Sequence, residues 1–265
     1  MKRNYLNKVV WITGASSGIG EELARQFDRE GARLVLSARN EHSLNELKAS
    51  LKGSKNHFVL PLDLEKSDNF SALARKVMDE MGAIDVLINN GGISQRATAS
   101  ETSMEVERKM MEVNYFGNIA LSKAVLPFMQ QQKSGQILII SSIAGKFGFF
   151  LRSAYSASKH ALMGYYESLS LEEEKNNISV TIACPGKINT SISMNALSAD
   201  GNVHGVMDHN QANGMSVETC VRQIIRAMKN NKREVMVGGK ELLAVKIKRF
   251  FPALFWQIIR KQKAT

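Results

Sequence analysis

Short apolar runs alternate with longer amphipathic stretches along most of the chain. The short runs are rich in Val, Ile and Leu and are apolar throughout, which is typical of parallel strands covered on both faces. The predicted strands span 9–13, 33–38, 57–62, 84–89, 136–142, 178–183 and 234–237. The predicted helices span 19–30, 41–51, 67–81, 104–131, 154–175 and 217–230. This alternation predicts an α/β fold with a doubly wound parallel sheet of about seven strands and helices on both faces.

The pattern also predicts a single domain. The chain has 265 residues, with no internal repeat and no linker rich in Pro, Gly or Ser. Thr102 and Glu105 have the spacing of a capping box, which predicts the start of the helix at 104–131. The longest irregular stretch, about 187–215, is rich in Ser, Asn, Gly and Met. Loops of this length are usually functional or disordered, so we expect a substrate lid, with a mobile insertion as the alternative.

Composition narrows the class of protein. A hydrophobic content of 44% with 23% charged residues is ordinary for a globular protein. The two cysteines, Cys184 and Cys220, lie far apart, so we expect no disulfide framework and a reducing, cytoplasmic location. The N-terminal apolar run at 9–12 is too short for the core of a signal peptide, and no run of 18 apolar residues follows.

Much of the net charge of +10 lies at the C-terminus. The segment 240–265 has seven Lys or Arg and one acid, Glu241, so it carries +6, and we expect no nucleic-acid partner for the rest of the chain. Within it, 246–263 places bulky apolar residues around Pro252 between cations. That pattern suits peripheral contact with an anionic membrane. A helix that packs on the domain or across a subunit interface is the open alternative.

A glycine-rich turn follows the first predicted strand. In TGASSGIG, Gly14, Gly18 and Gly20 would let the backbone and the next helix N-terminus approach a pyrophosphate. The second predicted strand ends in LVLSARN, where enzymes that use NAD usually have an acid. Here Ser37 stands at that place and Arg39 follows, and a guanidinium can pair with a 2′-phosphate. We therefore expect NADP(H) rather than NAD, although an exposed Arg is often only solvated.

The sequence YSASK places a phenol and an ammonium one helical turn apart. Tyr155 and Lys159 share a helix face because positions i and i+4 do so. A free tyrosine has a pKa of about 10, and a nearby cation favours the phenolate. This spacing predicts a lowered pKa for Tyr155 and a role as acid or base in proton transfer.

Six motifs in order resemble the short-chain dehydrogenase/reductase family, over about residues 7–239. They are TGASSGIG at 13–20, NNGG at 89–92, VNYFG at 113–117, IISSIAG at 139–145, YSASK at 155–159 and CPGKINT at 184–190. The resemblance implies a Rossmann-type NADP-binding catalytic domain over 1–239, followed by a basic and aromatic tail at 240–265. Gly91 is a departure, because the family usually has alanine there.

The resemblance also implies the site residues. The catalytic residues would be Asn114, Ser142, Tyr155 and Lys159. In this scheme Ser142 polarises the substrate oxygen, Ser141 caps the strand end, and Asn114 kinks its helix and holds a water in a proton relay to Lys159. The cofactor-binding residues would be Gly14, Ser16, Ser17, Gly18, Ile19, Gly20, Arg39, Asp63, Leu64, Asn90, Gly91, Tyr155, Lys159, Ile188 and Thr190.

Among these, Asp63 would contact the adenine, with helix capping equally open, and Asn90 would line the adenine ribose. Ile188 and Thr190 would bind the nicotinamide carboxamide. The five histidines have no metal-ligand spacing, and we predict no metal site. His160 is expected to point away from the catalytic face, and the two lid histidines are expected to be solvated.

The function that this pattern favours is an NADP(H)-dependent carbonyl reductase or alcohol dehydrogenase. Its substrate would be a small, hydrophobic or lipid-like ketone or secondary alcohol, and the family resemblance implies a homo-oligomer, either a dimer or a tetramer. Two alternatives stay open. One is reduction of 3-oxoacyl groups on an acidic acyl carrier protein, and the other is a non-catalytic NADP-sensing protein.

Overall fold

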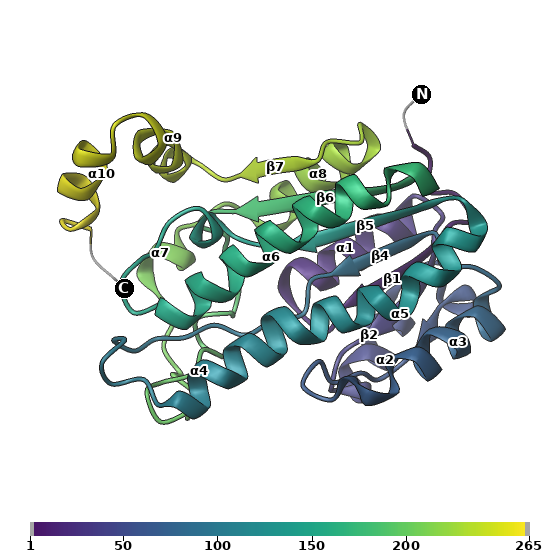
Figure 1. Cartoon of the computed structure of the whole chain (residues 1–265). Coiled ribbons are helices and arrows are strands. Elements are labelled where there is room, and N and C mark those ends of the chain that lie inside the picture. The colour runs from purple at the N-terminus through teal and green to yellow at the C-terminus, as the bar shows by residue number, and fades with distance from the viewer. Residues whose placement is uncertain (1–2, 263–265) are drawn as a thin grey trace.

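The computed structural model describes residues 3–262, and within them seven strands form one parallel sheet (Figure 1). The strands are β1 (Val9–Thr13), β2 (Arg33–Ser37), β3 (Phe58–Val59), β4 (Val86–Asn89), β5 (Gly135–Ile140), β6 (Ile178–Pro185) and β7 (Glu234–Val237). Their order across the sheet is β3-β2-β1-β4-β5-β6-β7, and every neighbouring pair is parallel. The predicted fold class is confirmed, and the order reverses at β1 as in a doubly wound fold.

Helices cover both faces of the sheet. One face carries α3 (Phe70–Met81), α4 (Met104–Met111), α5 (Gly117–Gln132) and α6 (Ser153–Glu172). The other carries α1 (Gly18–Arg29), α2 (Glu41–Ser50) and α8 (Val217–Lys229). Because side chains alternate along a strand, Trp11 of β1 packs with the first group and Ile12 with the second. This alternation explains why the strands are apolar throughout.

The edge strand β3 is shorter than predicted. The apolar run suggested a strand over 57–62, but regular pairing covers only Phe58 and Val59. Single hydrogen bonds continue beyond it, from Leu60 N to Leu36 O at 3.0 Å and from Leu62 N to Ala38 O at 3.1 Å. Pro61, which has no N–H, lies between them at a position that faces the open edge of the sheet. The prediction of a six-residue strand was therefore wrong in length.

The helix predicted at 104–131 is two helices joined by a π-helical turn, Glu112–Phe116. Asn114, which the sequence marked as a helix kink, lies within that turn and is fully buried. The predicted capping box was wrong by one position. Ser103 is the N-cap and its hydroxyl accepts from Val106 N at 3.3 Å, whereas the Thr102 hydroxyl donates to Thr98 O at 2.7 Å.

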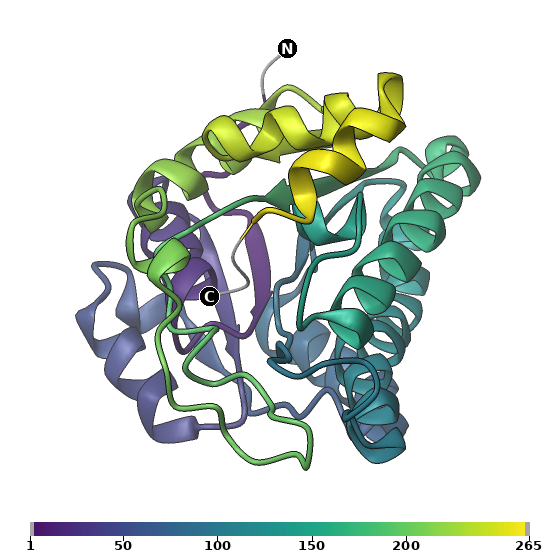
Figure 2. The ribbon, with the colours of Figure 1, turned by 90° about the vertical axis from the view of Figure 1, so that its left-hand side faces the viewer.

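The irregular segments gather at the carboxyl edge of the sheet, where open α/β folds bind ligands (Figure 2). The segment 187–215 contains only a short helix, α7 (His209–Ala212). The tail forms α9 (Leu243–Phe250) and α10 (Pro252–Ile259), and the last three residues of the chain lie outside the described part. No helix within residues 3–262 combines the length and apolar character needed to cross a bilayer.

Candidate active site

Two cavities meet at the carboxyl edge of the sheet. The larger, of about 870 Å³, lies between the turn after β1, the ends of β2 and β4, and the segment after β6. The second, of about 540 Å³, lies beneath α9 and α10. Ser142 and Tyr155 line both cavities, so they stand where the contents of one would touch the contents of the other.

The turn from β1 into α1 is shaped by its glycines. Gly14 and Gly18 have φ of +63° and +56°, a left-handed conformation that favours glycine. A Cβ on Gly20 would lie 2.1 Å from Gly14 O, so Gly20 lets the helix approach the turn without itself lining the cavity. The first turn of α1 has no side-chain cap at Ser17, and Ser17, Gly18 and Ile19 line the larger cavity. This is the cradle that a pyrophosphate requires.

The remaining predicted cofactor residues line the same cavity. They are Ser16, Ser17, Ile19, Arg39, Asp63, Leu64, Asn90, Gly91, Tyr155, Lys159, Ile188 and Thr190, together with Gly14 and Gly18. Asn90 also fastens the turn, since its Nδ2 donates to Thr13 O at 3.0 Å and to Gly14 O at 3.1 Å. Asp63 accepts from Glu65 N at 3.1 Å, a local turn rather than a helix cap. Their individual contacts with a cofactor stay predictions.

Gly91 fits closely against its surroundings. An alanine Cβ there would lie 2.6 Å from Leu64 Cδ1, the flexible end of a side chain that could move aside. Glycine at position 91, where the family usually has alanine, therefore lets the Leu64 side chain pack closely against the backbone beside the cavity.

The end of β2 explains why its serine is not a cofactor residue. Ser37 is fully buried, its hydroxyl donates to Leu60 O at 2.6 Å, and it accepts from Trp11 Nε1 at 2.9 Å. The chain turns outward at the next residues, and Arg39 lines the cavity and is exposed. Among the described residues, the one acid in the cavity lining is Asp63, against the cations Arg39, Lys109 and Lys159.

Tyr155 lies in the first turn of α6, facing the end of β5. Its hydroxyl is hydrogen-bonded to the side chain of Ser142, which also accepts from Ala144 N at 3.1 Å. That second bond fixes the Ser142 rotamer, and the hydroxyl of Ser141, which also lines the larger cavity, donates to Lys159 O at 3.2 Å. The tyrosine and serine therefore converge from two elements that are held together.

The pKa of Tyr155 differs from the sequence prediction. Burial raises the pKa of Tyr155, and the hydrogen bond with Ser142 and the charges of Arg96 and Arg152 only partly oppose this. The prediction of a lowered pKa was wrong for the chain alone, because it considered the cation and not the desolvation of the phenolate. Tyr155 is thus a neutral phenol at pH 7, which is the form that donates a proton.

Lys159 is buried one turn beyond Tyr155. Its ammonium donates to Ile140 O at 2.8 Å and lies 5.6 Å from the centroid of the Tyr155 ring. Burial lowers the pKa of Lys159 to about 8. Its neighbour His160 is exposed and bonds to Ser156 O, away from the site as predicted.

Asn114 stands behind this pair. Its Oδ1 accepts from Ile93 N at 2.8 Å and its Nδ2 donates to Ser158 Oγ at 3.1 Å. A Cβ on Gly92 would lie 2.9 Å from Asn114 Oδ1 and 3.6 Å from Lys159 Nζ. The amide of Asn114 and the ammonium of Lys159 therefore both lie next to Gly92. The π-helical turn therefore places Asn114 beside Lys159, and the water relay stays a prediction.

Burial of Lys159 leads to a stability prediction. Its pKa is lower in the folded chain, about 8, than the ordinary 10.5, so the folded state binds fewer protons between these values. Below pH 8 the buried charge lowers the free energy of unfolding by about 3 kcal/mol, and this loss disappears as the pH rises to about 10.5. Lys159→Met removes this loss but leaves Ile140 O without its donor, which offsets part of the gain. The free energy of unfolding at pH 7 should therefore rise by about 1–2 kcal/mol.

Urea denaturation from pH 7 to 10.5 checks this prediction. The stability difference between variant and wild type should shrink as the pH rises. A difference that is constant across this window would show that the Lys159 charge carries no such cost.

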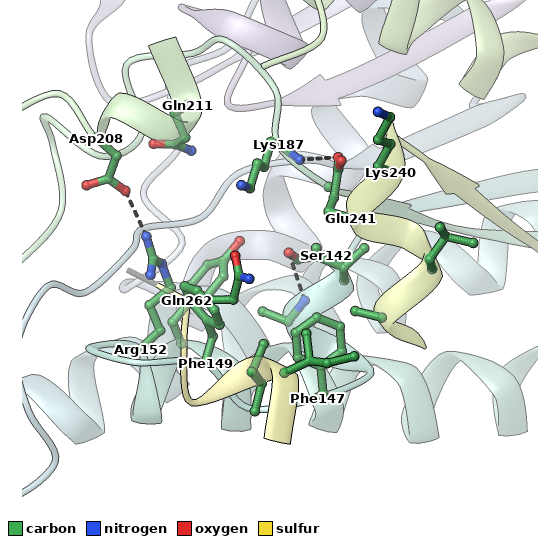
Figure 3. A pocket seen from close by; sticks show the side chains of 18 of the residues that line it. Ser142, Phe147, Phe149, Arg152, Lys187, Asp208, Gln211, Lys240, Glu241 and Gln262 are labelled. Carbon is green, nitrogen blue, oxygen red and sulfur yellow. Dashed lines mark hydrogen bonds and ion pairs between the residues drawn. The ribbon is translucent and has the colours of Figure 1, made fainter. Parts of the chain in front are cut away.

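The smaller cavity combines an apolar wall with a charged one (Figure 3). Phe147, Phe149, Phe255 and Ile259 form much of the apolar side. The charged part is Asp208, at the start of α7, and Arg152, with Asp208 Oδ2 2.7 Å from Arg152 Nη2. The Arg152 guanidinium also lies 5.2 Å from the centroid of the Phe149 ring, so the charged and apolar parts adjoin.

Asp208 is also paired with Arg96. Arg96 Nε lies 3.0 Å from Asp208 Oδ2, and both side chains are almost fully buried. Arg96 makes further bonds to Ser94 Oγ and Gln95 O. The segment 187–215 is therefore anchored to the loop after β4 by a buried ionic group.

The sequence analysis missed this ionic group and the aromatic wall. Arg96 and Asp208 are 112 positions apart, and nothing in their local sequence indicates a partner. A weaker signal was available, because Arg152 lies two positions before the predicted helix at 154–175 and three before Tyr155. Phe255 and Ile259 were assigned to a tail and not to a cavity wall.

No group of three or more potential metal ligands occurs among residues 3–262. The buried histidine His57 lies far from the cavities and bonds to Asp28 Oδ1 at 2.9 Å, where it joins α1 to β3. Burial lowers its pKa despite that carboxylate, so it is neutral at pH 7.

Comparison with known proteins gives consistent results. The short chain dehydrogenase family profile matches residues 8–201. "Dehydrogenase/reductase SDR family member 7B" of Mus musculus is 44% identical over 259 residues, which cover 96% of this chain and 80% of that protein. "Dehydrogenase/reductase SDR family protein 7-like" of Anopheles gambiae is 40% identical over 98% of this chain and 84% of its own length.

Solved structures share the architecture. A short-chain dehydrogenase from Streptomyces avermitilis superposes with a TM-score of 0.81 at 27% identity, over 95% of this chain and 96% of its own. A short chain dehydrogenase/reductase from Burkholderia phymatum superposes with a TM-score of 0.83 over 99% of this chain and 98% of its own. At 20% identity the second shows a common fold only.

Proposed function

The chain belongs to the short-chain dehydrogenase/reductase family of oxidoreductases, and from this we propose that it transfers hydride between NADP(H) and the carbonyl or carbinol carbon of a hydrophobic small molecule. The observation that carries the proposal is that Ser142 and Tyr155 line both cavities. A cofactor in the larger cavity and a substrate in the smaller one would meet at these two hydroxyl groups. When bound, NADPH supplies the hydride.

The residues of the chain supply the proton and the orientation. Ser142, held by Ala144 N, binds the substrate oxygen in a fixed position. Tyr155, a neutral phenol at pH 7, donates its proton to that oxygen. The Lys159 ammonium then stabilises the phenolate that remains, and the Arg96 and Arg152 charges act in the same direction.

The lining of the smaller cavity supports a hydrophobic substrate. Its aromatic wall, formed by Phe147, Phe149 and Phe255, offers apolar surface to most of a bound molecule. The hydroxyl pair lies at one end, so the reacting oxygen would be held there and the apolar part directed toward α10. Carrier-linked substrates stay the alternative, and the same assay tests them.

Charge supports NADP(H) over NAD(H). Arg39 lines the larger cavity and is exposed at the end of β2, whereas Asp63, the one acid among the described lining residues, follows β3 instead. Arg39→Ala should raise the KM for NADPH by about 10–100-fold, the value of one or two charged hydrogen bonds, and leave the KM for NADH almost unchanged. Steady-state kinetics with both dinucleotides measure this.

Lys109→Ala is the matched control for Arg39→Ala. It removes another cation from the same cavity, one that lies 3.6 Å from Glu65. Arg39→Ala should reduce the preference for NADPH over NADH much more than Lys109→Ala does. An equal loss for NADPH and NADH in Arg39→Ala would exclude a 2′-phosphate contact.

The experiment that tests the function is oxidation of NADPH and NADH with a panel of ketones, including carrier-linked 3-oxoacyl groups. We expect turnover with hydrophobic ketones and a preference for NADPH. Turnover only with carrier-linked substrates would favour the second candidate. Binding of NADPH with no turnover on any member would favour a sensing role.

A further inference from the structure

The tail helices present an apolar surface that no other part of residues 3–262 covers. We call Leu243, Phe250, Phe251, Leu254 and Trp256 the tail surface. Phe250 is 67% exposed, Phe251 63% and Trp256 56%. Scattered exposed apolar residues are normal, but several large ones on two adjoining helices mark an interaction site.

The same helices carry exposed cations. Lys246, Arg249, Arg260 and Lys261 are exposed, and Arg249 lies 5.9 Å from the Phe250 ring centroid. Within residues 3–262, no carboxylate forms an ion pair with these four residues. The acid of the tail, Glu241, is turned inward and accepts from Lys187 N at 2.9 Å. The outer side of the tail is therefore apolar and cationic.

Packing on the domain accounts only for the inner side of α10. Phe255 and Ile259 are buried, and the Phe255 and Phe147 rings lie 5.3 Å apart at 64°. Lys248 Nζ donates to Lys146 O at 2.8 Å and holds α9 in place. These contacts fix the helix pair with the tail surface facing outward, so the surface is formed before any partner binds.

We propose that the tail surface docks the protein onto an anionic lipid bilayer. Aromatic side chains flanked by Lys and Arg are suited to the interface, where rings enter the acyl boundary and cations meet lipid phosphates. Two helices of eight residues each, with Phe251 between them and Pro252 at the start of the second, suit a position along such an interface and are too short to cross it. The positive charge favours an anionic bilayer as the partner, because a neutral protein surface would offer these cations no opposite charge.

The docked position also places the smaller cavity against the bilayer. Leu243 and Ile258 line that cavity and are 56% and 38% exposed, so they belong to both the cavity and the outer surface. A hydrophobic substrate dissolved in the bilayer would enter past these side chains without crossing water. This entry route rests on the proposed function, whereas the docking itself does not.

The two tryptophans provide a direct test of docking. Trp11 is fully buried in the sheet and Trp256 lies on the tail surface. Vesicles of phosphatidylcholine with phosphatidylglycerol should shift the emission of the full chain to the blue, and vesicles of phosphatidylcholine alone should do so much less. Trp256→Phe should still cosediment with the anionic vesicles while losing the shift.

Matched substitutions distinguish binding through the tail surface from nonspecific hydrophobic binding to vesicles. Phe250→Ser with Phe251→Ser should weaken cosedimentation by at least about tenfold, since two large apolar groups leave the interface. Met104→Ser with Leu171→Ser is the control, because those residues are 64% and 63% exposed on other helices.

Lys246→Gln with Arg249→Gln should weaken binding by about fivefold per charge, with less effect in high salt. None of the tail residues replaced lines a cavity.

Several outcomes would overturn the proposal. Equal binding of wild type and the Phe250/Phe251 variant, or equal binding to neutral and anionic vesicles, would exclude docking through this surface. Self-association without lipid, abolished by Phe250→Ser and Phe251→Ser and unaccompanied by vesicle binding, would assign the surface to a second copy of the chain. NADPH binding, measured in parallel, distinguishes a folding defect from a docking defect.

Discussion

Tyr155→Phe should lower the turnover of a carbonyl substrate by about 10²–10⁴-fold, the usual contribution of a positioned general acid. The phenol is the one group hydrogen-bonded to Ser142 that can deliver a proton where the two cavities meet. Phenylalanine keeps the ring and removes only the hydroxyl, so NADPH binding should hardly change. Single-turnover kinetics and fluorescence titration with NADPH measure the two effects separately.

Tyr165→Phe is the control for this change. Tyr165 lies on the same helix, is half-buried and lines neither cavity. Its variant should retain activity. If Tyr155→Phe kept wild-type turnover, or if both variants lost it together, Tyr155 would not be the proton donor.

Asp208→Asn should destabilise the protein by about 3–5 kcal/mol, because it leaves buried cations without their counter-charge. Arg96 is almost fully buried, and Arg152 shares the same carboxylate. Since Asp208 anchors 187–215 to the loop after β4, part of this loss should appear as local opening of that segment. Urea denaturation gives the global value, and amide exchange shows whether 187–215 opens first.

Asp200→Asn provides the comparison within the same segment. Asp200 is exposed and bonds only to neighbours, Ser198 and Asn202. Its replacement should leave the free energy of unfolding almost unchanged. Equal effects at the two positions would mean that the buried ionic group does not hold the segment.

The fold could be predicted because each level of the sequence agreed with the next. Wholly apolar runs such as that of β1 required a sheet covered on both faces, and Trp11 and Ile12 pack on opposite sides of it. The edge strand β3 was overestimated because apolar periodicity does not show where regular pairing ends, and beyond Val59 single hydrogen bonds to β2 follow.

Local motifs in the sequence led to residues that line the cavities, whereas contacts between residues far apart in the sequence were missed. The spacing of Tyr155 and Lys159 within one helix indicates a shared face, and both line the larger cavity. The pairing of Arg96 with Asp208 depends on how two distant loops meet, which no local pattern describes. The pKa of Tyr155 was misjudged for a similar reason, because desolvation is set by the whole fold.

The tail illustrates a third case. The sequence left membrane contact and packing on the domain as alternatives, and the structure shows packing through Phe255 and Ile259 with Phe250 exposed beyond it. Because one helix can pack on one side and remain open on the other, the two interpretations are compatible.

The central claim is that hydride crosses from one cavity to the other beside Ser142 and Tyr155. The most direct measurement uses NADPH with deuterium at nicotinamide C4, each stereoisomer in turn, with a hydrophobic ketone that the panel identifies. Mass spectrometry should find deuterium on the new carbinol carbon from one stereoisomer only, and none with Tyr155→Phe over the same time. Deuterium from neither stereoisomer with any ketone, or equal transfer by Tyr155→Phe, would contradict the account.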